Sequence, residues 1–203
     1  MKKNKISKNW INKQRRDIYV KKSKIEGYRS RAVYKLEEIN TKFKILTNGS
    51  KIIDLGAAPG SWSQYISKKV KNSKTVAIDL NDMEKIENIT IIKGDFTNEI
   101  IQSKIIELLG MKADVILSDM AVNTTGNKDL DSIQTGELCL QAMVFSKKYL
   151  SSNGKFISKI FMGSSFNEIV TIAKKKFKDV NVFKPPASRK DSKESFIICK
   201  ILR

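Results

Sequence analysis

The chain has 203 residues, of which 39 are Lys or Arg and 21 are Asp or Glu, so its formal net charge is +18. This length suits one domain, and no apolar run reaches the ~20 residues of a membrane-spanning helix. There is no histidine, and the only cysteines, Cys139 and Cys199, lack CxxC spacing. A disulfide scaffold, a metal site and a Ser-His or Cys-His mechanism are therefore not expected.

The positive charge is concentrated towards the two ends of the sequence. Residues 1–35 carry 13 basic and two acidic side chains, residues 174–203 carry 10 basic and three acidic ones, and residues 36–173 are neutral. A lysine-rich composition alone predicts no such segregation, whereas basic surface beside a neutral core is typical of proteins that bind polyanions. We therefore expect nucleic acid as the partner.

The N-terminal residues 1–29 lack sustained periodicity and are predicted to form a basic extension. Within it, Trp10, Ile11 and the apolar residues 18–20 would hold a short helix against the body. The first regular element predicted is a helix over residues 30–43, with Ser30 as its candidate N-cap. Residues 30–203 are expected to form a single domain.

Short apolar runs and helical patterns alternate after this first helix. Strands are predicted at residues 51–55, 75–80, 89–93, 114–118, 154–160, 179–184 and 195–201, and helices at residues 61–70, 98–109, 131–150 and 164–177. This alternation indicates an α/β, Rossmann-like fold with a mostly parallel seven-stranded sheet and helices on both faces. The link over residues 185–194 is too short for a helical crossover, so the last strand should be antiparallel.

A glycine-containing segment, residues 54–60 (DLGAAPG), connects the first predicted strand to a helix, where open α/β sheets bind ligands. Its spacing is G-x-x-x-G rather than the G-x-G-x-x-G that holds a pyrophosphate, and Pro59 removes one N–H. The loop therefore favours a nucleoside cofactor without phosphates, S-adenosylmethionine, over a nicotinamide dinucleotide. Asp79 is placed to bind ribose hydroxyls and Asp95 to bind the adenine amino group. A tight turn without any ligand is the alternative.

Two polar residues stand at the ends of central strands. Asp119 closes the fourth predicted strand, and Lys159 lies among Phe and Ile residues near the end of the fifth. A lysine there is costly unless a carboxylate or a function accounts for it. Burial lowers its pKa and a carboxylate raises it, so Lys159 is either a candidate general base or a lysine that extends to solvent. Glu194 and Lys35, taken singly, are typical surface residues.

Five segments together resemble the FtsJ/RrmJ family of RNA ribose 2′-O-methyltransferases. They are residues 30–36 (SRAVYKL), 54–65 (DLGAAPGSWSQY), 94–96 (GDF), 118–121 (SDMA) and 184–194 (KPPASRKDSKE). The resemblance implies a catalytic tetrad of Lys35, Asp119, Lys159 and Glu194. It also implies cofactor contacts at Gly60, Trp62, Asp79, Asp95 and Asp119.

The resemblance further implies a substrate and a cellular setting. It implies S-adenosylmethionine-dependent 2′-O-methylation of a ribose, expected to be a uridine, in large-subunit ribosomal RNA, and residues 124–131 are most similar to that branch. The alternatives are a tRNA ribose 2′-O-methyltransferase and an RNA-binding ribosome-assembly factor. We expect ribosomal RNA or the large ribosomal subunit as partner, no metal, no membrane, a monomer, and a cytoplasmic or, alternatively, mitochondrial location.

Overall fold

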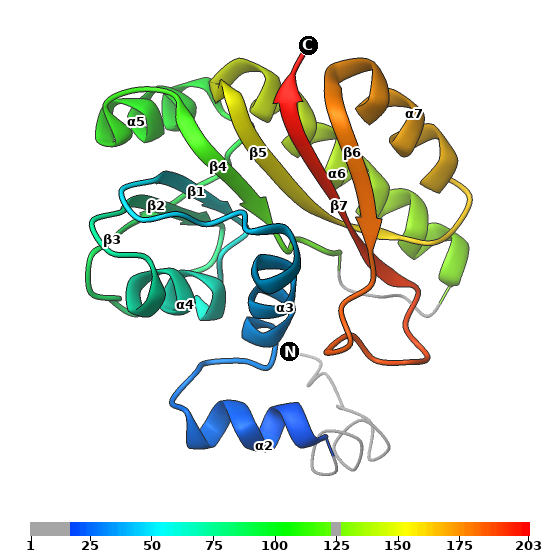
Figure 1. Cartoon of the computed structure of the whole chain (residues 1–203), viewed down its shortest axis with the longest axis horizontal. Helices are drawn as coiled ribbons and strands as arrows, with labels where there is room; N and C mark the ends of the chain where they lie inside the picture. The colour runs from blue at the N-terminus through cyan, green and yellow to red at the C-terminus, as the bar shows by residue number, and fades with distance from the viewer. Residues whose placement is uncertain (1–16, 123–126) are drawn as a thin grey trace, which may run out of the picture.

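Seven apolar runs of the sequence form one sheet in the computed structural model, which describes residues 17–122 and 127–203. The strands are β1 (Lys51–Leu55), β2 (Lys74–Asp79), β3 (Ile89–Lys93), β4 (Ala113–Ser118), β5 (Leu150–Phe161), β6 (Phe177–Phe183) and β7 (Glu194–Leu202). Their order in the sheet is β3-β2-β1-β4-β5-β7-β6 (Figure 1). Strands β1 to β5 are parallel, and β7 runs antiparallel to both β5 and β6. The predicted fold class, including the antiparallel last strand, is confirmed.

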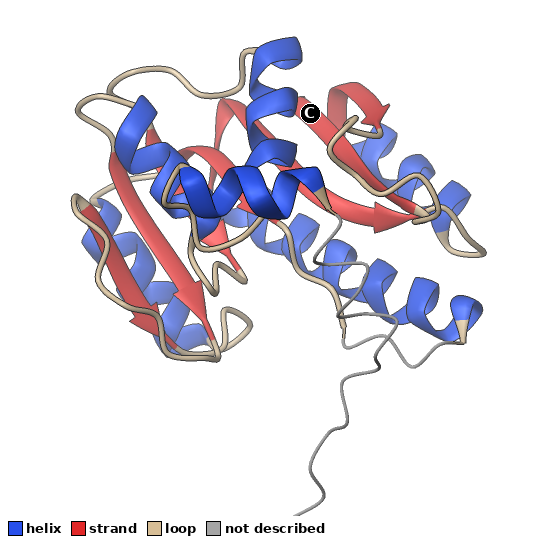
Figure 2. Ribbon diagram, turned by 90° about the horizontal axis from the view of Figure 1, so that it is seen from below, coloured by secondary structure: helices blue, strands red, loops and turns tan. Residues whose placement is uncertain are grey.

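Helices cover both faces of this sheet (Figure 2). They are α2 (Ile18–Ile25), α3 (Val33–Phe43), α4 (Ser61–Lys69), α5 (Glu99–Leu109), α6 (Lys128–Tyr149) and α7 (Phe166–Lys176). One core cluster joins α3 and α4 to the sheet and another joins α5, α6 and α7 to the opposite face. Successive strand residues point to opposite faces, so Phe156 of β5 faces α7 while Ile157 faces the α3 layer.

The starts of two helices differ from the predictions, one because of a tertiary contact and the other because of a local cap. Helix α3 begins at Val33 with Ala32 at the N-cap position, so the prediction of Ser30 as N-cap is wrong. The Ser30 hydroxyl lies 2.8 Å from that of Ser61 instead, which ties the segment to α4. Helix α6 starts earlier than predicted, because the side chain of Asn127 accepts hydrogen bonds from the N–H groups of residues 129 and 130.

Helix α2 is held by its cap and by aromatic packing rather than by an apolar stripe. Asp17 Oδ1 accepts hydrogen bonds from the N–H groups of Tyr19 and Val20, and the Tyr19 ring lies 5.4 Å from that of Tyr34 on α3. Ile18 and Ile25 are exposed. Trp10, Ile11 and residues 123–126, on which parts of the sequence interpretation depended, lie outside the described residues.

The two cysteines are buried and unpaired, and burial raises the pKa of the Cys139 thiol to about 12. Within residues 17–122 and 127–203, no group of three or more acidic or cysteine side chains is placed to hold a metal ion. The same residues contain no helix that is long and apolar enough to cross a bilayer.

Candidate active site

The glycine loop, residues 56–60, closes the turn between β1 and α4. Apart from Pro59, which has none, its backbone N–H groups are all bonded internally: those of Gly56 and Ala57 to Ile78 O, that of Ala58 to Asp79 Oδ2 and that of Gly60 to Ala57 O. A phosphate-binding loop needs N–H groups that point at the ligand. This loop offers none, which is consistent with the prediction of a cofactor without phosphates at this turn.

Glycine is required at two positions of the loop. Gly56 has a φ of +67°, and a Cβ there would lie 2.1 Å from Met120 Cγ. Gly60 has a φ of +104°, which side-chain-bearing residues rarely adopt. The two glycines therefore allow the close approach of Met120 and the sharp entry into α4.

A cavity of about 680 Å³ opens at the carboxyl ends of β1, β2 and β4, and Asp79, Asp95 and Asp119 are among its lining residues. Asp79 Oδ1 accepts hydrogen bonds from the backbone and side-chain nitrogens of Asn81, at 2.8 and 3.0 Å. Asp95 Oδ1 accepts from the N–H and the hydroxyl of Thr97, both at 2.8 Å. The volume lies in the range of small-ligand sites, and the carboxylates are held at its wall.

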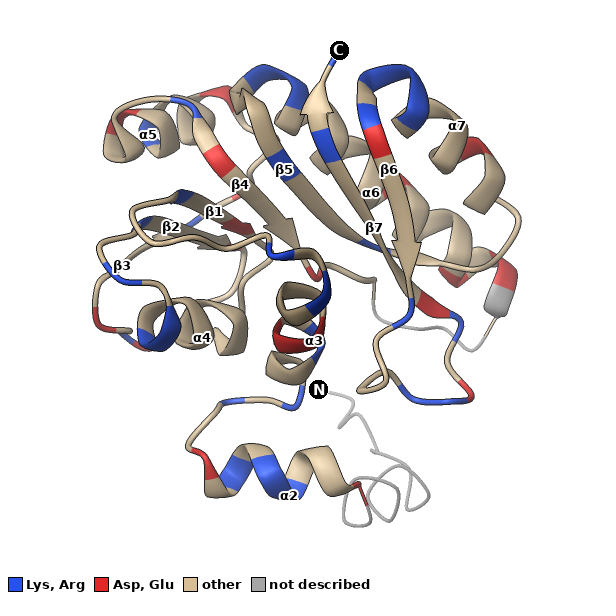
Figure 3. Ribbon diagram, viewed as in Figure 1, with Lys and Arg blue, Asp and Glu red and all other residues tan. Residues whose placement is uncertain are grey.

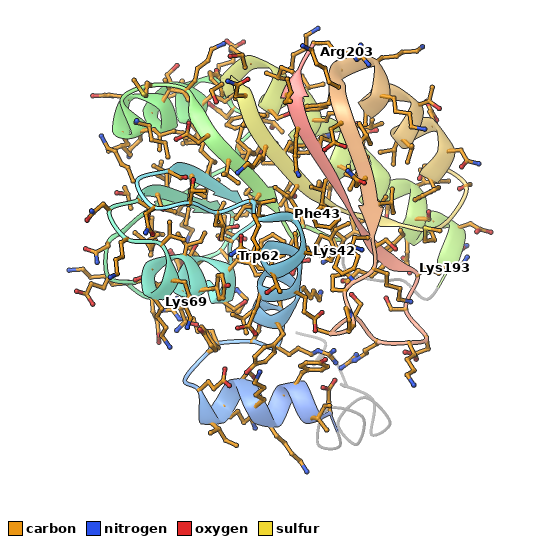
Figure 4. All side chains as sticks on the ribbon, viewed as in Figure 1. Lys42, Phe43, Trp62, Lys69, Lys193 and Arg203 are labelled. Carbon is orange, nitrogen blue, oxygen red and sulfur yellow. The ribbon has the colours of Figure 1, made fainter. Side chains whose placement is uncertain are left out.

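A smaller cavity of about 100 Å³ is lined by Asp119, Pro59, Ser61 and Trp62, at the start of α4. The Trp62 indole belongs to the core, because its Nε1 donates to Ala32 O at 2.8 Å and only 3% of the residue is exposed (Figure 4). The N-cap residue Gly60 has no side chain to cap α4, and the Ser63 N–H is bonded to Asp54. The backbone N–H groups of Ser61 and Trp62 are thus those left for an anion. Any contact of Gly60 or Trp62 with a cofactor would therefore be made by backbone atoms.

Strand register brings the four predicted catalytic side chains together. Ser118, the last residue of β4, pairs with Ser158 of β5, so Asp119 and Lys159, which follow them in the chain, become neighbours. Glu194 begins β7 and pairs with the end of β5. Lys35 reaches the same point from α3. The structure thus places all four members of the tetrad at one end of the sheet, beside the two cavities.

The four charges alternate in a ring. Lys159 Nζ lies 2.7 Å from Asp119 Oδ1 and 3.6 Å from Glu194 Oε2, and it donates to the Asp119 carbonyl at 2.8 Å. Lys35 Nζ lies 2.7 Å from Glu194 Oε2 and 3.6 Å from Asp119 Oδ2. The side chains are between 8% and 17% exposed. Two cations thus balance two anions in a nearly buried site, so each charge has partners that offset its cost of desolvation.

The ring controls the protonation of its members. Burial alone lowers the pKa of Lys159, but the charges of Asp119 and Glu194 outweigh it and raise that pKa above 10.5. Burial raises the pKa of Glu194, but Lys35 and Lys159 and a hydrogen bond from Ser188 lower it to about 2. In the protein without ligands Lys159 is therefore an ammonium group. It has to lose a proton before it can act as a base.

The loop between β6 and β7 positions Glu194 through contacts that the sequence analysis did not identify. The buried Ser188 hydroxyl donates to Glu194 Oε1 at 2.7 Å. The neighbouring peptide of Ala187 donates to Glu38 Oε2 at 2.7 Å and accepts from the Arg31 guanidinium. The motif at residues 184–194 marked this loop as part of the site in the sequence. Only the structure shows that contacts with α3 hold the loop in place.

A second missed group is Asp54, which is fully buried beneath the smaller cavity. Its Oδ2 accepts from the Ser63 hydroxyl at 2.7 Å. Burial raises the pKa of Asp54 to about 7, and the charges of Asp119 and Asp79 act in the same direction. The position of Asp54 within the glycine-loop motif did not predict its raised pKa, because the burial of this carboxyl group depends on the packing of α4 above it.

Basic residues lie on α2 and on the loop between β6 and β7 (Figure 3). Helix α2 carries several lysines, and the loop between β6 and β7 carries Lys193, which Figure 4 labels; both Lys190 and Lys193 of this loop are exposed. The two segments are joined by Asp17, which pairs with Arg31 and lies 3.5 Å from Arg189 Nε. Part of the segregated charge thus lies near the site, whereas the basic side chains at the end of α7, the start of β6 and the end of β7 lie at the opposite end of the sheet.

Comparison with known proteins identifies similar sequences along the whole chain. A family model described as FtsJ-like methyltransferase matches residues 28–202. A Pelagibacter ubique (strain HTCC1062) protein named ribosomal RNA large subunit methyltransferase E is 66% identical over 203 residues, which are 100% of both chains. A Rickettsia akari protein of the same name is 48% identical over 198 residues, 95% of this chain and 87% of that one.

Solved structures give the same fold. A Plasmodium falciparum protein described as a ribosomal RNA methyltransferase superposes with a TM-score of 0.77 at 35% identity, over 86% of this chain and 98% of that one. A Clostridium thermocellum protein described as an rRNA methylase gives a TM-score of 0.55 at 18% identity, over 82% and 96%. The second likeness concerns the fold alone.

Proposed function

Because the chain belongs to the FtsJ-like methyltransferase family, we propose that it methylates the 2′-oxygen of a ribose, expected to be a uridine, in large-subunit ribosomal RNA. The names of the relatives support the RNA class. The observation that carries the ribose 2′-O chemistry is the buried ring of Lys35, Asp119, Lys159 and Glu194. It offers an amine, held by two carboxylates, as the acceptor for a hydroxyl proton.

The cavity fits S-adenosylmethionine, which when bound supplies an activated methyl group. Asp79 would bind the ribose hydroxyls and Asp95 the adenine amino group. The start of α4 after Gly60, including the backbone N–H of Trp62, would bind the carboxylate of the amino-acid part, and Asp119 its ammonium group. Since residues 56–60 have no N–H groups left for a phosphate, they oppose a dinucleotide.

Within the ring, Lys159 takes the proton of the 2′-hydroxyl while the oxygen is methylated. Asp119 and Glu194 fix the direction of the Lys159 amine, and Lys35 positions the ribose and balances the carboxylates. The amine must first become neutral, against the ion pairs that raise its pKa. Exclusion of water when RNA covers the site lowers the pKa of an ammonium group, which is the direction that a base requires.

The surface beside the ring is suited to a phosphate backbone. Lysines of α2 and of the loop with Lys190 and Lys193 would bind phosphates on either side of the target nucleotide, and only RNA carries a 2′-hydroxyl. We expect a monomer that needs no metal, since the methyl group is already activated. The two relatives named above are bacterial, which favours the cytoplasm over mitochondria.

The test is to map 2′-O-methyl groups in total RNA from cells with the protein, without it, and with the Lys159→Ala variant. Loss of one large-subunit rRNA methyl group in both mutant strains supports the proposal. Loss of a tRNA methyl group would identify the alternative substrate. If Lys159→Ala restores ribosome assembly without methylation, the protein acts as an assembly factor.

A further inference from the structure

Arg29, which lies between α2 and α3, joins two loops that form walls of the large cavity. Its Nη1 donates to Pro59 O at 2.9 Å and to Glu84 O at 3.1 Å, and its Nη2 donates to Lys85 O at 3.2 Å. Pro59 belongs to the glycine loop, whereas residues 84 and 85 belong to the connection between β2 and β3. That connection begins at residues 80 and 81, which line the cavity.

The guanidinium head is suited to this position by its geometry. It presents several N–H donors in one plane, and here these donors satisfy carbonyl oxygens from both loops at once. The side chain is only 17% exposed. A Cβ on Gly60 would lie 2.7 Å from Arg29 Nη1 and 2.8 Å from Ile86 Cδ1, so the guanidinium occupies the space beside that glycine.

The backbone of Arg29 is anchored independently of its side chain. Its N–H donates to Gln64 Oε1 of α4 at 2.8 Å, and Gln64 Nε2 donates to Gly27 O at 3.3 Å. The segment before α3 is therefore fixed to α4 even without the guanidinium. A change in the side chain can thus be separated from detachment of the segment.

We propose that Arg29 is a positioning residue for the cofactor, which acts by holding the glycine loop and the β2–β3 connection in their binding arrangement. Without it, these loops would have to become ordered when the ligand binds, and the cost of ordering would weaken binding. This inference rests on the proposed function, because it takes the cavity to be the S-adenosylmethionine site. Arg29 contacts the walls from behind and does not take part in methyl transfer.

The test is calorimetric titration of the full-length protein with S-adenosylmethionine. Arg29→Ala should raise Kd roughly tenfold or more, because hydrogen bonds from a charged donor are lost on both loops. Arg29→Lys, which keeps the charge but not the planar donors, should also bind more weakly. With substrate RNA, KM for the cofactor should rise by a similar factor while kcat at saturation changes less than about twofold.

Two variants serve as matched controls. Glu84→Gln removes the ion pair between Arg29 Nη2 and the exposed carboxylate of Glu84, which lie 3.6 Å apart. It leaves the hydrogen bonds from the Arg29 guanidinium to the backbone carbonyls intact, so Kd should not change. Gln64→Ala releases the backbone anchor and keeps the guanidinium, and it should also leave Kd within about twofold.

The outcomes are distinct. Unchanged Kd in both Arg29 variants, or a loss of kcat without a change in KM, would overturn the inference while the proposed function stands. Equal weakening by Glu84→Gln would show that the ion pair, and not the carbonyl contacts, is responsible, and would also overturn it. If the wild-type protein binds no S-adenosylmethionine, the proposed function fails together with the inference. If Arg29→Ala does not fold, Arg29→Lys decides.

Discussion

Replacing Lys159 tests the proposed chemistry directly. The Lys159→Ala variant loses the amine that lies 2.7 Å from Asp119 Oδ1 and with it the proposed proton acceptor. A positioned acid–base group contributes roughly 10²–10⁴ to kcat, which is about 3–5 kcal/mol of activation free energy. Lys159→Arg keeps a cation in the ring but stays protonated, so it should lose as much activity as Lys159→Ala.

The assay is single-turnover methyl transfer to substrate RNA at saturating cofactor, followed across pH. Because the ring raises the pKa of Lys159, the wild-type rate should increase about tenfold per pH unit until that pKa, as modified by bound RNA, is reached. The exposed Lys68→Ala serves as a control and should behave as wild type. The affinity for S-adenosylmethionine should be nearly the same in all variants.

Folding has to be checked in the same experiment. Loss of the Lys159 charge leaves two nearly buried carboxylates with Lys35 alone, and an unpaired buried charge costs about 3–5 kcal/mol. For a chain of this size, that lowers Tm by roughly 10 °C, so rates should be measured well below the midpoint. If Lys159→Arg retains activity within a factor of two, the base role is wrong and the cation itself is what matters.

Three further predictions concern the cavity, the buried carboxyl group and the basic surface. Asp79→Ala should raise Kd for S-adenosylmethionine roughly tenfold in calorimetry, since a ribose contact is lost; an unchanged Kd would place the cofactor elsewhere. Asp54 has a pKa of about 7, raised from 3.8, so the folded state binds its proton more tightly and stability falls as pH rises from about 4 to 7. In chemical denaturation at pH 8, Asp54→Asn should therefore be the more stable protein, by up to about 4 kcal/mol, with a flatter pH dependence, and equal stability would contradict the raised pKa. Lys190→Ala should reduce the salt dependence of RNA binding by roughly 0.7–0.9 log unit per log unit of salt, and an unchanged slope would remove Lys190 from the interface.

The sheet could be predicted because its signals are local. Apolar runs bounded by polar residues placed all seven strands, and the short link after residue 184 predicted the direction of β7. The start of α3 could not be predicted in the same way. Ser30 is a good N-cap residue by type, but its hydroxyl contacts Ser61, which is distant in sequence.

Only part of the candidate site could be predicted from the sequence. Asp79 and Asp119 stand at strand ends, where parallel sheets bind ligands, so local reasoning located them. The partnership of Lys35 with Glu194 came from the resemblance, since it depends on α3 crossing the sheet beside β7. The matches to known proteins confirm that resemblance. The contacts of Arg29 gave no signal in the sequence, because they are made to backbone carbonyls.

The position of β7 has a consequence for how the protein folds during its synthesis. This strand follows every other strand in the chain, yet it lies between β5 and β6 in the sheet, and its first residue is Glu194. While the nascent polypeptide is still being translated, the gap between β5 and β6 stays open and the fourth member of the charge ring is missing. The sheet is therefore completed, and the ring of four charges closed, only after β7 has left the ribosomal exit tunnel and has inserted between β5 and β6.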